Sequence, residues 1–398
     1  MSTPALNLEQ ALAVPGPVHT LPPLDIAEGL ISDPALGAVA RKLRQGQRLE
    51  RADGLALMDS KDILGLGAMA HAARLAKNGR KAFYVLNRHL NYSNICLNKC
   101  TFCAYWRDEG QERAFLLSPA EAGAKAQERP DQAVDEFHIV GSCHPSLSLS
   151  YYLDLLAAVR AARPQATLKA FTPVEIDHLA RISGQPVKDL LAQLQAAGLG
   201  AMPGGGAEVF SPRVRDKLCP KKISGKRWLE ISAAAHSLGI PTNATMLYGH
   251  IETAEERVDH LLALRDQQDA SGGFSAFIPL SFHPANTGLE NLNATTGLDD
   301  LRVIAASRLL LDNFPHIKAY WVMLGPKLAQ VALNFGADDL DGTIVEERIT
   351  HMAGATTAQG LTEADLRRMI AASGFTPVRR DSFYRHLPSA QAVSADAR

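Results

Sequence analysis

The sequence predicts an α/β fold, a (β/α)8 TIM-type barrel, from two observations. Short apolar runs of strand type alternate with amphipathic helical stretches along most of the 398 residues. The polar residues best suited to chemistry follow directly after those strand-type runs. Alternating strands and helices are typical of a parallel sheet, and eight such units close into a barrel. The length is compatible with this, because α/β barrels run long as single units.

A helical segment precedes the predicted barrel. Residues 1–30 are rich in Pro and Leu without a clear period, so we expect an irregular lead-in. In residues 33–79, apolar side chains recur at spacings of three and four and glycines close the segments. This pattern predicts helices. Residues 1–79 are therefore expected to form an N-terminal lead-in and helical segment.

The predicted barrel spans residues 80–348, and residues 349–398 follow as a helical cap and polar tail. The cap is predicted from the amphipathic stretch LTEADLRRMIAASG. The predicted barrel strands are residues 81–87, 135–141, 167–172, 198–204, 243–249, 275–281, 317–323 and 340–344. Because barrel active sites lie at the carboxyl ends of the strands, the polar residues after these runs are candidate site residues.

Charge and hydropathy exclude several classes of partner. The formal net charge is −1, so no overall field attracts nucleic acid or an anionic membrane. No apolar run approaches the roughly 20 residues of a membrane span. The N-terminus lacks the basic start and apolar stretch of a signal peptide. We therefore expect a cytoplasmic protein without a nucleic-acid or membrane partner.

Three of the five cysteines lie within eight residues and indicate metal or redox chemistry. Cys96, Cys100 and Cys103 have the spacing C-x3-C-x2-C within NYSNICLNKCTFCAYWR. Thiolates are the natural ligands of iron–sulfur clusters. A [4Fe–4S] cluster held by three thiolates leaves one iron open, which the amino and carboxylate groups of S-adenosylmethionine (SAM) can chelate. The loop therefore predicts a [4Fe–4S] cluster with SAM as its partner.

Other interpretations of the loop remain open. Zinc prefers four ligands, usually two Cys pairs, but His89 lies nearby and could complete a Cys3His site. A non-catalytic zinc or iron–sulfur protein is therefore an alternative of another class. Phe102 and Tyr105 flank the third cysteine. They could shield the cluster and flank the adenine of SAM, or they could simply pack.

The wider sequence resembles a known family. The cysteine loop, with an aromatic residue before its third Cys, resembles the radical SAM superfamily motif. The run RHLNYSNICLNKCTFCAY resembles the branch that contains the aminofutalosine synthases, the cyclic dehypoxanthinyl futalosine synthases and the deazaflavin (FO) synthases. Within that branch, the aminofutalosine synthases of menaquinone biosynthesis are indicated by FHIVGSCHP, KAFTPVEIDHLARISG, GGGAEVFSPRVRDKLCPKKIS with NATMLYGHIETAEERVDHL, and GGFSAFIPLSFHPANTGL.

The resemblance implies a reaction. Aminofutalosine synthases add the 5′-deoxyadenosyl radical of SAM to 3-[(1-carboxyvinyl)oxy]benzoate. Rearrangement and decarboxylation then give 6-amino-6-deoxyfutalosine and methionine. SAM is consumed as a co-substrate, and a reductant such as flavodoxin or ferredoxin supplies the electron. The sister activities, cyclic dehypoxanthinyl futalosine synthase and a deazaflavin synthase subunit, remain alternatives.

The same resemblance suggests roles for residues after the second and third strands. By position, Gly141 and Ser142 would contact the methionine part of SAM, although Ser142 stands where a second glycine is expected. The alternative is a simple βα turn. Glu175 could bind the ribose hydroxyls or the ammonium group of SAM. It could equally be an acidic first-turn residue that the helix dipole favours.

Residues after the fifth and sixth strands are the catalytic candidates. His250 and Glu252 lie two apart at a strand end, and His283 follows the next strand. Such groups could perform acid–base work or bind a substrate carboxylate. His138 lies within a strand and is expected to be a hydrogen-bonded core histidine, and Lys222 is expected to face solvent.

Overall fold

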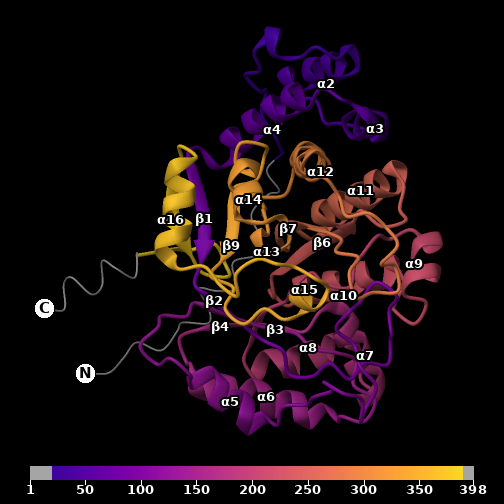
Figure 1. Ribbon diagram of the computed structural model, residues 1–398, viewed down its shortest axis with the longest axis vertical. Coiled ribbons are helices and arrows are strands. Elements are labelled where there is room, and N and C mark those ends of the chain that lie inside the picture. The colour runs from indigo at the N-terminus through magenta and orange to yellow at the C-terminus, as the bar shows by residue number, and fades with distance from the viewer. Residues whose placement is uncertain (1–19, 389–398) are drawn as a thin grey trace, which may run out of the picture.

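The computed structural model describes residues 20–388, and a ring of parallel strands forms its centre (Figure 1). Three ladders have the strand orders β2-β3-β4-β5, β6-β7-β8 and β11-β10-β1-β9. Three bridges join them: Met202 with Thr242, Lys318 with Asp339, and Arg88 with Val345. Counting β1 and β2 as one strand, these links close eight parallel strands, so the predicted (β/α)8 barrel is confirmed.

The strands are short and largely buried on both faces, as expected for a parallel sheet covered by helices. Their bounds are β1 Lys81–Val85, β2 Asn87–Leu90, β3 Glu136–Ile139, β4 Thr167–Ala170, β5 Leu199–Ala201, β6 Thr242–Tyr248, β7 Phe274–Ser281, β8 His316–Ile317, β9 Asp339–Gly342, β10 Thr376–Arg380 and β11 His386–Leu387.

Helices follow the strands, and several begin at a capping box, in which a Ser or Thr and an acidic residue three positions later satisfy free backbone N–H groups. Such boxes start α5, α7, α11, α12 and α16. The helix bounds are η1 Glu28–Leu30, α2 Pro34–Arg44, α3 Arg51–Asp59, α4 Ile63–Asn78, α5 Pro119–Gln127, α6 Leu149–Ala162, α7 Pro173–Ser183, α8 Val187–Ala196, α9 Pro212–Leu218, α10 Gly225–Ser237, α11 Ala254–Ser271, α12 Gly297–Leu310, α13 Trp321–Leu324, α14 Pro326–Ala332, α15 Ile349–Met352 and α16 Glu363–Ala372.

The predicted strand at 317–323 was wrong over most of its length. Only β8 is extended, and the chain turns into α13 at Trp321. The Trp321 indole donates a hydrogen bond to the carbonyl of Gly342 at 2.8 Å, which anchors this helical turn against β9. A short, continuously apolar run looks the same in a buried strand and in a buried helical turn.

The C-terminal segment contains a strand that the sequence pattern did not reveal. The predicted helix LTEADLRRMIAASG is present as α16, and β10 follows it. β10 runs parallel to β1. It pairs with the edge of β1 that stays unpaired because β3 pairs with β2 and not with β1. Its sequence, TPVRR, lacks the apolar alternation expected of a strand. The division into 1–79, 80–348 and 349–398 remains a prediction, and its terminal parts, 1–19 and 389–398, lie outside the described residues.

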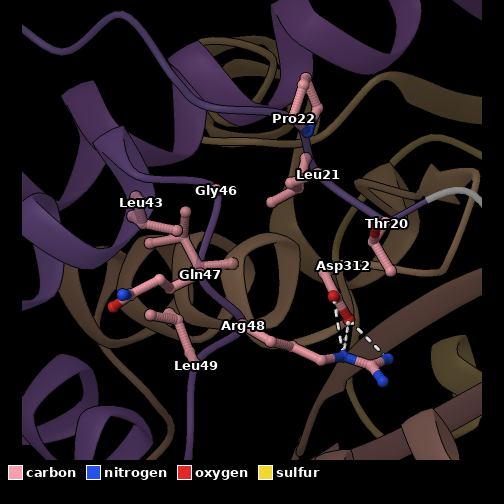
Figure 2. Close-up of a pocket in the computed structure, with 10 residues that line it drawn as sticks. Thr20, Leu21, Pro22, Leu43, Gly46, Gln47, Arg48, Leu49 and Asp312 are labelled. Atoms are coloured by element: carbon pink, nitrogen blue, oxygen red, sulfur yellow. Dashed lines mark hydrogen bonds and ion pairs between the residues drawn. The ribbon is translucent and has the colours of Figure 1, made fainter.

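The predicted N-terminal helices are present as α2, α3 and α4, and they pack on the outside of the barrel against α11 and α12 (Figure 1). Arg48 connects this segment to the barrel through Asp312 and Asp269, at 2.8 and 2.6 Å. Figure 2 shows the small hollow beside Arg48. It holds about 70 Å³, well below the 300–1,000 Å³ of typical ligand pockets. No helix among residues 20–388 is long and apolar enough to cross a lipid bilayer.

Buried ion pairs fill the amino-terminal part of the barrel and join it to β10. Lys169 contacts Glu136 at 2.5 Å, and Lys318 contacts Asp341 at 3.0 Å. Arg380 of β10 contacts Asp339 of β9 at 2.6 Å, and both side chains have no exposed surface. A buried charge is tolerated only when it is paired, so the pairing to β10 helps to fix this strand.

We predict that Arg380→Met destabilises the protein by about 3–5 kcal/mol, because it leaves Asp339 buried without its guanidinium partner. Urea unfolding followed by circular dichroism measures the change. Arg385→Met is the matched control, since Arg385 is 56% exposed and pairs with Asp381. Because Asp381 is itself only 8% exposed but keeps hydrogen bonds from the N–H groups of Phe383 and Arg385, this variant should cost clearly less than Arg380→Met. Equal losses in the two variants would contradict the assigned role of Arg380.

Candidate active site

The cysteine loop lies across the carboxyl ends of the strands and is fixed there by backbone hydrogen bonds. Leu97 N–H donates to the Cys143 carbonyl after β3 at 3.0 Å. Thr101 N–H donates to the Leu218 carbonyl at the end of α9 at 2.9 Å, and Gly288 N–H, after β7, donates to the Thr101 carbonyl at 2.7 Å. Three separate segments of the chain therefore hold one eight-residue loop.

The three thiols of the loop differ in acidity. Burial raises the pKa of Cys100 to about 12, and burial also raises the pKa of Cys103. The pKa of Cys96 is lowered to about 6, chiefly because the Cys143 thiol donates a hydrogen bond to it. The thiols of Cys100 and Cys96 each interact electrostatically with that of Cys103, so the three groups lie within range of one another.

A buried ion pair faces the thiols. The Lys222 ammonium contacts a Glu208 carboxylate oxygen at 2.5 Å and lies 4.9 Å from the centre of the Phe102 ring. Its positive charge favours the thiolate forms of Cys96, Cys100 and Cys103. The prediction that Lys222 faces solvent was wrong, because its side chain is only 13% exposed while the neighbouring Lys221 is exposed. Two adjacent lysines in a loop give no signal of which one points inward.

The turn after β3 packs against Tyr92, a residue the sequence analysis did not single out. A Cβ on Gly141 would lie 2.6 Å from the Tyr92 ring, so only glycine fits at this position. The Ser142 hydroxyl donates to the Ile95 carbonyl at 2.7 Å, and the Ser142 N–H donates to the Tyr92 hydroxyl at 3.3 Å. Ser142 therefore connects the turn to the segment that leads into the cysteine loop.

Glu175 connects the same elements to α7. One carboxylate oxygen accepts from the Tyr92 hydroxyl at 2.7 Å and from the Gly141 N–H at 3.1 Å. The other accepts from the N–H and the hydroxyl of Thr172 at 2.7 and 2.8 Å. Burial raises the pKa of this carboxyl. Glu175 is thus a first-turn residue of α7, which agrees with the helix interpretation, and its contact with SAM stays a prediction.

His250 and Glu252 form a buried pair after β6. The Nδ1 atom of His250 lies 2.7 Å from a Glu252 oxygen, and neither side chain is exposed. Burial opposes the charge of Glu252, but His250 and Arg257, the latter at 2.6 Å, lower its pKa to about 2. The Nε2 atom of His250 is buried and lacks a hydrogen-bond partner within residues 20–388. The sequence-predicted pair is therefore assembled, with one free imidazole nitrogen.

The other predicted site residues lie at different places around the mouth of the barrel, the end formed by the carboxyl ends of the strands. The Nε2 atom of His283 interacts with the Met323 carbonyl of α13 at 3.1 Å. The His250 ring packs edge-on against Phe282, so the two histidines are neighbours without direct contact. Phe102 lies half-buried beneath Lys222. Tyr105 is buried, and its hydroxyl has no partner among the described residues.

Comparison with known proteins agrees with this arrangement. The sequence profile of the radical SAM superfamily matches residues 90–264, and that of the CofH/MqnC C-terminal region matches residues 271–393. The aminodeoxyfutalosine synthase of Thermus thermophilus is 48% identical over 361 residues, covering 90% of this chain and 97% of the relative. This chain belongs to the radical SAM superfamily. It is a radical SAM enzyme, and this family uses a [4Fe–4S] cluster and SAM.

Further relatives carry two different names. The aminodeoxyfutalosine synthase of Streptomyces coelicolor is 42% identical, with coverage of 87% of this chain and 92% of the relative. The 5-amino-6-(D-ribitylamino)uracil–L-tyrosine 4-hydroxyphenyl transferase of Methanopyrus kandleri is 39% identical, with coverage of 87% and 94%. Methylornithine synthase, a solved structure, has the same fold with a TM-score of 0.66 at 18% identity, covering 84% of this chain and 95% of its own.

The residues of this radical SAM enzyme fit an iron–sulfur cluster. Lys222 favours the thiolate form of all three cysteines, and two of them, Cys100 and Cys103, line a hollow of about 470 Å³. Across residues 20–388, no three His, Cys, Asp or Glu side chains converge closely enough to bind a single metal ion. Burial lowers the pKa of the His89 imidazole, and the charged groups that act on it most are Glu347 and Asp341.

The different acidities give a prediction for protein from which iron has been removed. At pH 7, Cys96 is mainly a thiolate, since its pKa is about 6, whereas Cys100 is a thiol, since its pKa is about 12. Thiolates are the reactive form. Cys96 should therefore be alkylated at least ten times faster than Cys100 when iodoacetamide labelling is followed by peptide mass spectrometry. Faster labelling of Cys100 would contradict the assigned hydrogen bond from Cys143.

Proposed function

We propose that this radical SAM enzyme is an aminofutalosine synthase. It transfers the 5′-deoxyadenosyl group of SAM to 3-[(1-carboxyvinyl)oxy]benzoate, and after rearrangement and loss of CO2 it releases 6-amino-6-deoxyfutalosine and methionine. The supporting observation is the 48% identity to an aminodeoxyfutalosine synthase along 97% of that relative's length. A flavodoxin or ferredoxin is the proposed electron donor.

In this proposal Cys96, Cys100 and Cys103 hold the cluster. When bound, the cluster supplies the electron that cleaves a carbon–sulfur bond of SAM. The protein places the thiols in a partly buried loop and sets the Lys222 charge beside them. A reactive primary alkyl group must be generated next to its target, and the closed barrel provides that proximity and excludes competing partners.

The turn after β3 and the start of α7 are the proposed SAM contacts. Gly141 leaves space over Tyr92, and Ser142 holds the turn on the cysteine loop. Glu175 accepts four hydrogen bonds from the protein, so it shapes this wall of the site. Phe102 and Tyr105 are the proposed aromatic neighbours of the cluster and of adenine.

His250, Glu252 and His283 are the proposed substrate-facing residues. Glu252 is held ionised by Arg257 and orients His250 through Nδ1. The free Nε2 atom of His250 can then donate a hydrogen bond to, or take a proton from, a bound substrate. His283 supplies a second imidazole on the adjoining strand end.

A sister reaction is the second candidate. Relatives at 37–40% identity are named 5-amino-6-(D-ribitylamino)uracil–L-tyrosine 4-hydroxyphenyl transferase, the deazaflavin synthase subunit activity. That reaction takes different substrates on a related chain. The higher identity to the two aminodeoxyfutalosine synthases, 48% and 42%, favours the first candidate.

An anaerobic assay with SAM, dithionite and the aryl enol ether tests the proposal by mass spectrometry. We expect a product that carries the adenosyl group and lacks one CO2. Formation of 5′-deoxyadenosine without such an adduct would contradict the reaction, and turnover of the uracil and tyrosine pair would support the second candidate.

Iron analysis tests the cluster ligands. The reconstituted enzyme should contain about four irons per chain, and Cys96→Ala, Cys100→Ala or Cys103→Ala should abolish both cluster and product. Cys219→Ala is the matched control, because Cys219 is a buried cysteine outside the loop, and it should retain the cluster. Retention of four irons in any loop variant would contradict the proposed ligand set.

A further inference from the structure

Two imidazole rings inside the barrel have no hydrogen-bond partner within residues 20–388. His89 of β2 and His138 of β3 stand opposite each other in the strand register. Their rings are stacked, with centres 4.5 Å apart and planes inclined by 13°. Within the part of the chain that the structure describes, neither ring makes a hydrogen bond. The expectation that His138 is a hydrogen-bonded core histidine was therefore wrong.

The pair faces the barrel interior below the cysteine loop. The same register row continues to Lys169 of β4, whose side chain meets Glu136 inside the barrel. Burial lowers the pKa of both imidazoles, and the charged groups that act on His89 are Glu347, Asp341, Glu136 and Lys169. Glu136, Lys169 and Asp341 lie on β3, β4 and β9, and Glu347 follows β9, so the rings face the same barrel interior as these charged groups.

The acidic groups around the pair already have cationic partners. Glu136 pairs with Lys169 at 2.5 Å and Asp341 with Lys318 at 3.0 Å. The third acid that acts on His89, Glu347, contacts the Nδ1 atom of His351 at 2.8 Å. The Oε1 atom of Glu136 is buried without a hydrogen-bond partner among the described residues, while its other oxygen contacts Lys169. No hydrogen bond joins any of these carboxylates to the rings of His89 and His138 within residues 20–388, which leaves both imidazoles able to donate to a ligand.

Other unpartnered polar atoms lie between the pair and the cysteine loop. The Oδ1 atom of Asn91, two residues beyond His89, is buried without a partner among the described residues. The buried hydroxyl of Tyr105 also has no partner among the described residues. The Glu347 carboxylate contributes to the pKa shifts of both Tyr105 and His89, so these two side chains lie near the same charged group. Buried polar groups without partners are rare and usually await a ligand or water.

We propose that the stacked pair of His89 and His138 binds the ring carboxylate of the aryl substrate in the barrel lumen. The inference rests on the proposed function and assigns a position to one of the two carboxylates of that substrate. A neutral imidazole offers one N–H donor, and an imidazolium offers two. Two stacked rings can each donate to one carboxylate, and hydrogen bonds to an ionised acceptor are the stronger kind.

This position would orient the substrate. With its ring carboxylate held by His89 and His138 deep in the barrel, the other end of the molecule points up toward the cysteine loop, where SAM is expected. The pair would therefore act as a specificity determinant, because a substrate without a carboxylate on the ring leaves both imidazoles without an acceptor.

Binding measured without reductant separates this inference from the proposed reaction. Anaerobic calorimetry on the holoenzyme with SAM uses two probes, 3-[(1-carboxyvinyl)oxy]benzoate and its analogue without the ring carboxylate, 2-phenoxyprop-2-enoate. The wild type should bind the first probe at least tenfold more tightly. His89→Phe and His138→Phe keep a stacked aromatic ring but remove the N–H groups, so they should weaken binding of the first probe at least tenfold. Binding of the second probe should not change.

Three controls test whether the substitutions act only on carboxylate binding. His386→Phe changes an exposed histidine of β11 in the same way and should bind both probes like the wild type. Unchanged SAM affinity in the lumen variants shows an intact site, and His138→Gln, which restores an N–H donor, should recover part of the lost affinity.

Each result has one consequence. If both Phe variants keep the full preference for the dicarboxylate, the inference is overturned even when the wild type forms the adduct. If the preference depends on the two histidines but dithionite yields no adduct, the proposed reaction fails and the carboxylate site stands. If the wild type shows no preference between the probes, the carboxylate site is contradicted.

Discussion

The buried carboxylate of Glu175 is the interaction on which the mouth of the barrel depends. It accepts hydrogen bonds from Tyr92, Gly141 and Thr172, and so it joins the segment before the cysteine loop to the turns after β3 and β4. The Tyr92 hydroxyl is also hydrogen-bonded to the backbone of Ser142, and the Ser142 hydroxyl donates a hydrogen bond to the Ile95 carbonyl. The cysteine loop begins at the next residue, so the position of its first thiol follows from this network.

Charge is distributed differently at the two ends of the barrel. At the amino-terminal end the acidic and basic groups are matched in buried pairs, including those that anchor β10. At the mouth, Lys222 places a positive charge beside thiols that must ionise to bind iron. The imidazoles of His89 and His138 lie in the same register row as Lys169, and neither has a hydrogen-bond acceptor among the described residues. Donors inside the barrel and a cation at the mouth suit a dianionic substrate below a thiolate-ligated cluster.

The sequence predicted the barrel and the loop because both depend on local patterns. Apolar runs ending in polar turns located β3, β4, β6 and β7 closely, and the cysteine spacing indicated an iron–sulfur site. Features set by long-range packing were missed. The strand β10 is polar in sequence and exists because β1 has a free side. The inward turn of Lys222 and the stacking of His89 on His138 depend on neighbours from distant segments, which no local period reveals.

The central claim is that three thiolates hold a cluster whose fourth iron is open to SAM. Mössbauer spectroscopy of enzyme reconstituted with ⁵⁷Fe tests it directly, because each iron contributes separately to the spectrum. Addition of SAM should change the isomer shift of one iron in about four and leave the others unchanged, in the wild type and in Cys143→Ala alike. A spectrum that SAM does not alter, or loss of the cluster in Cys143→Ala, would contradict the claim.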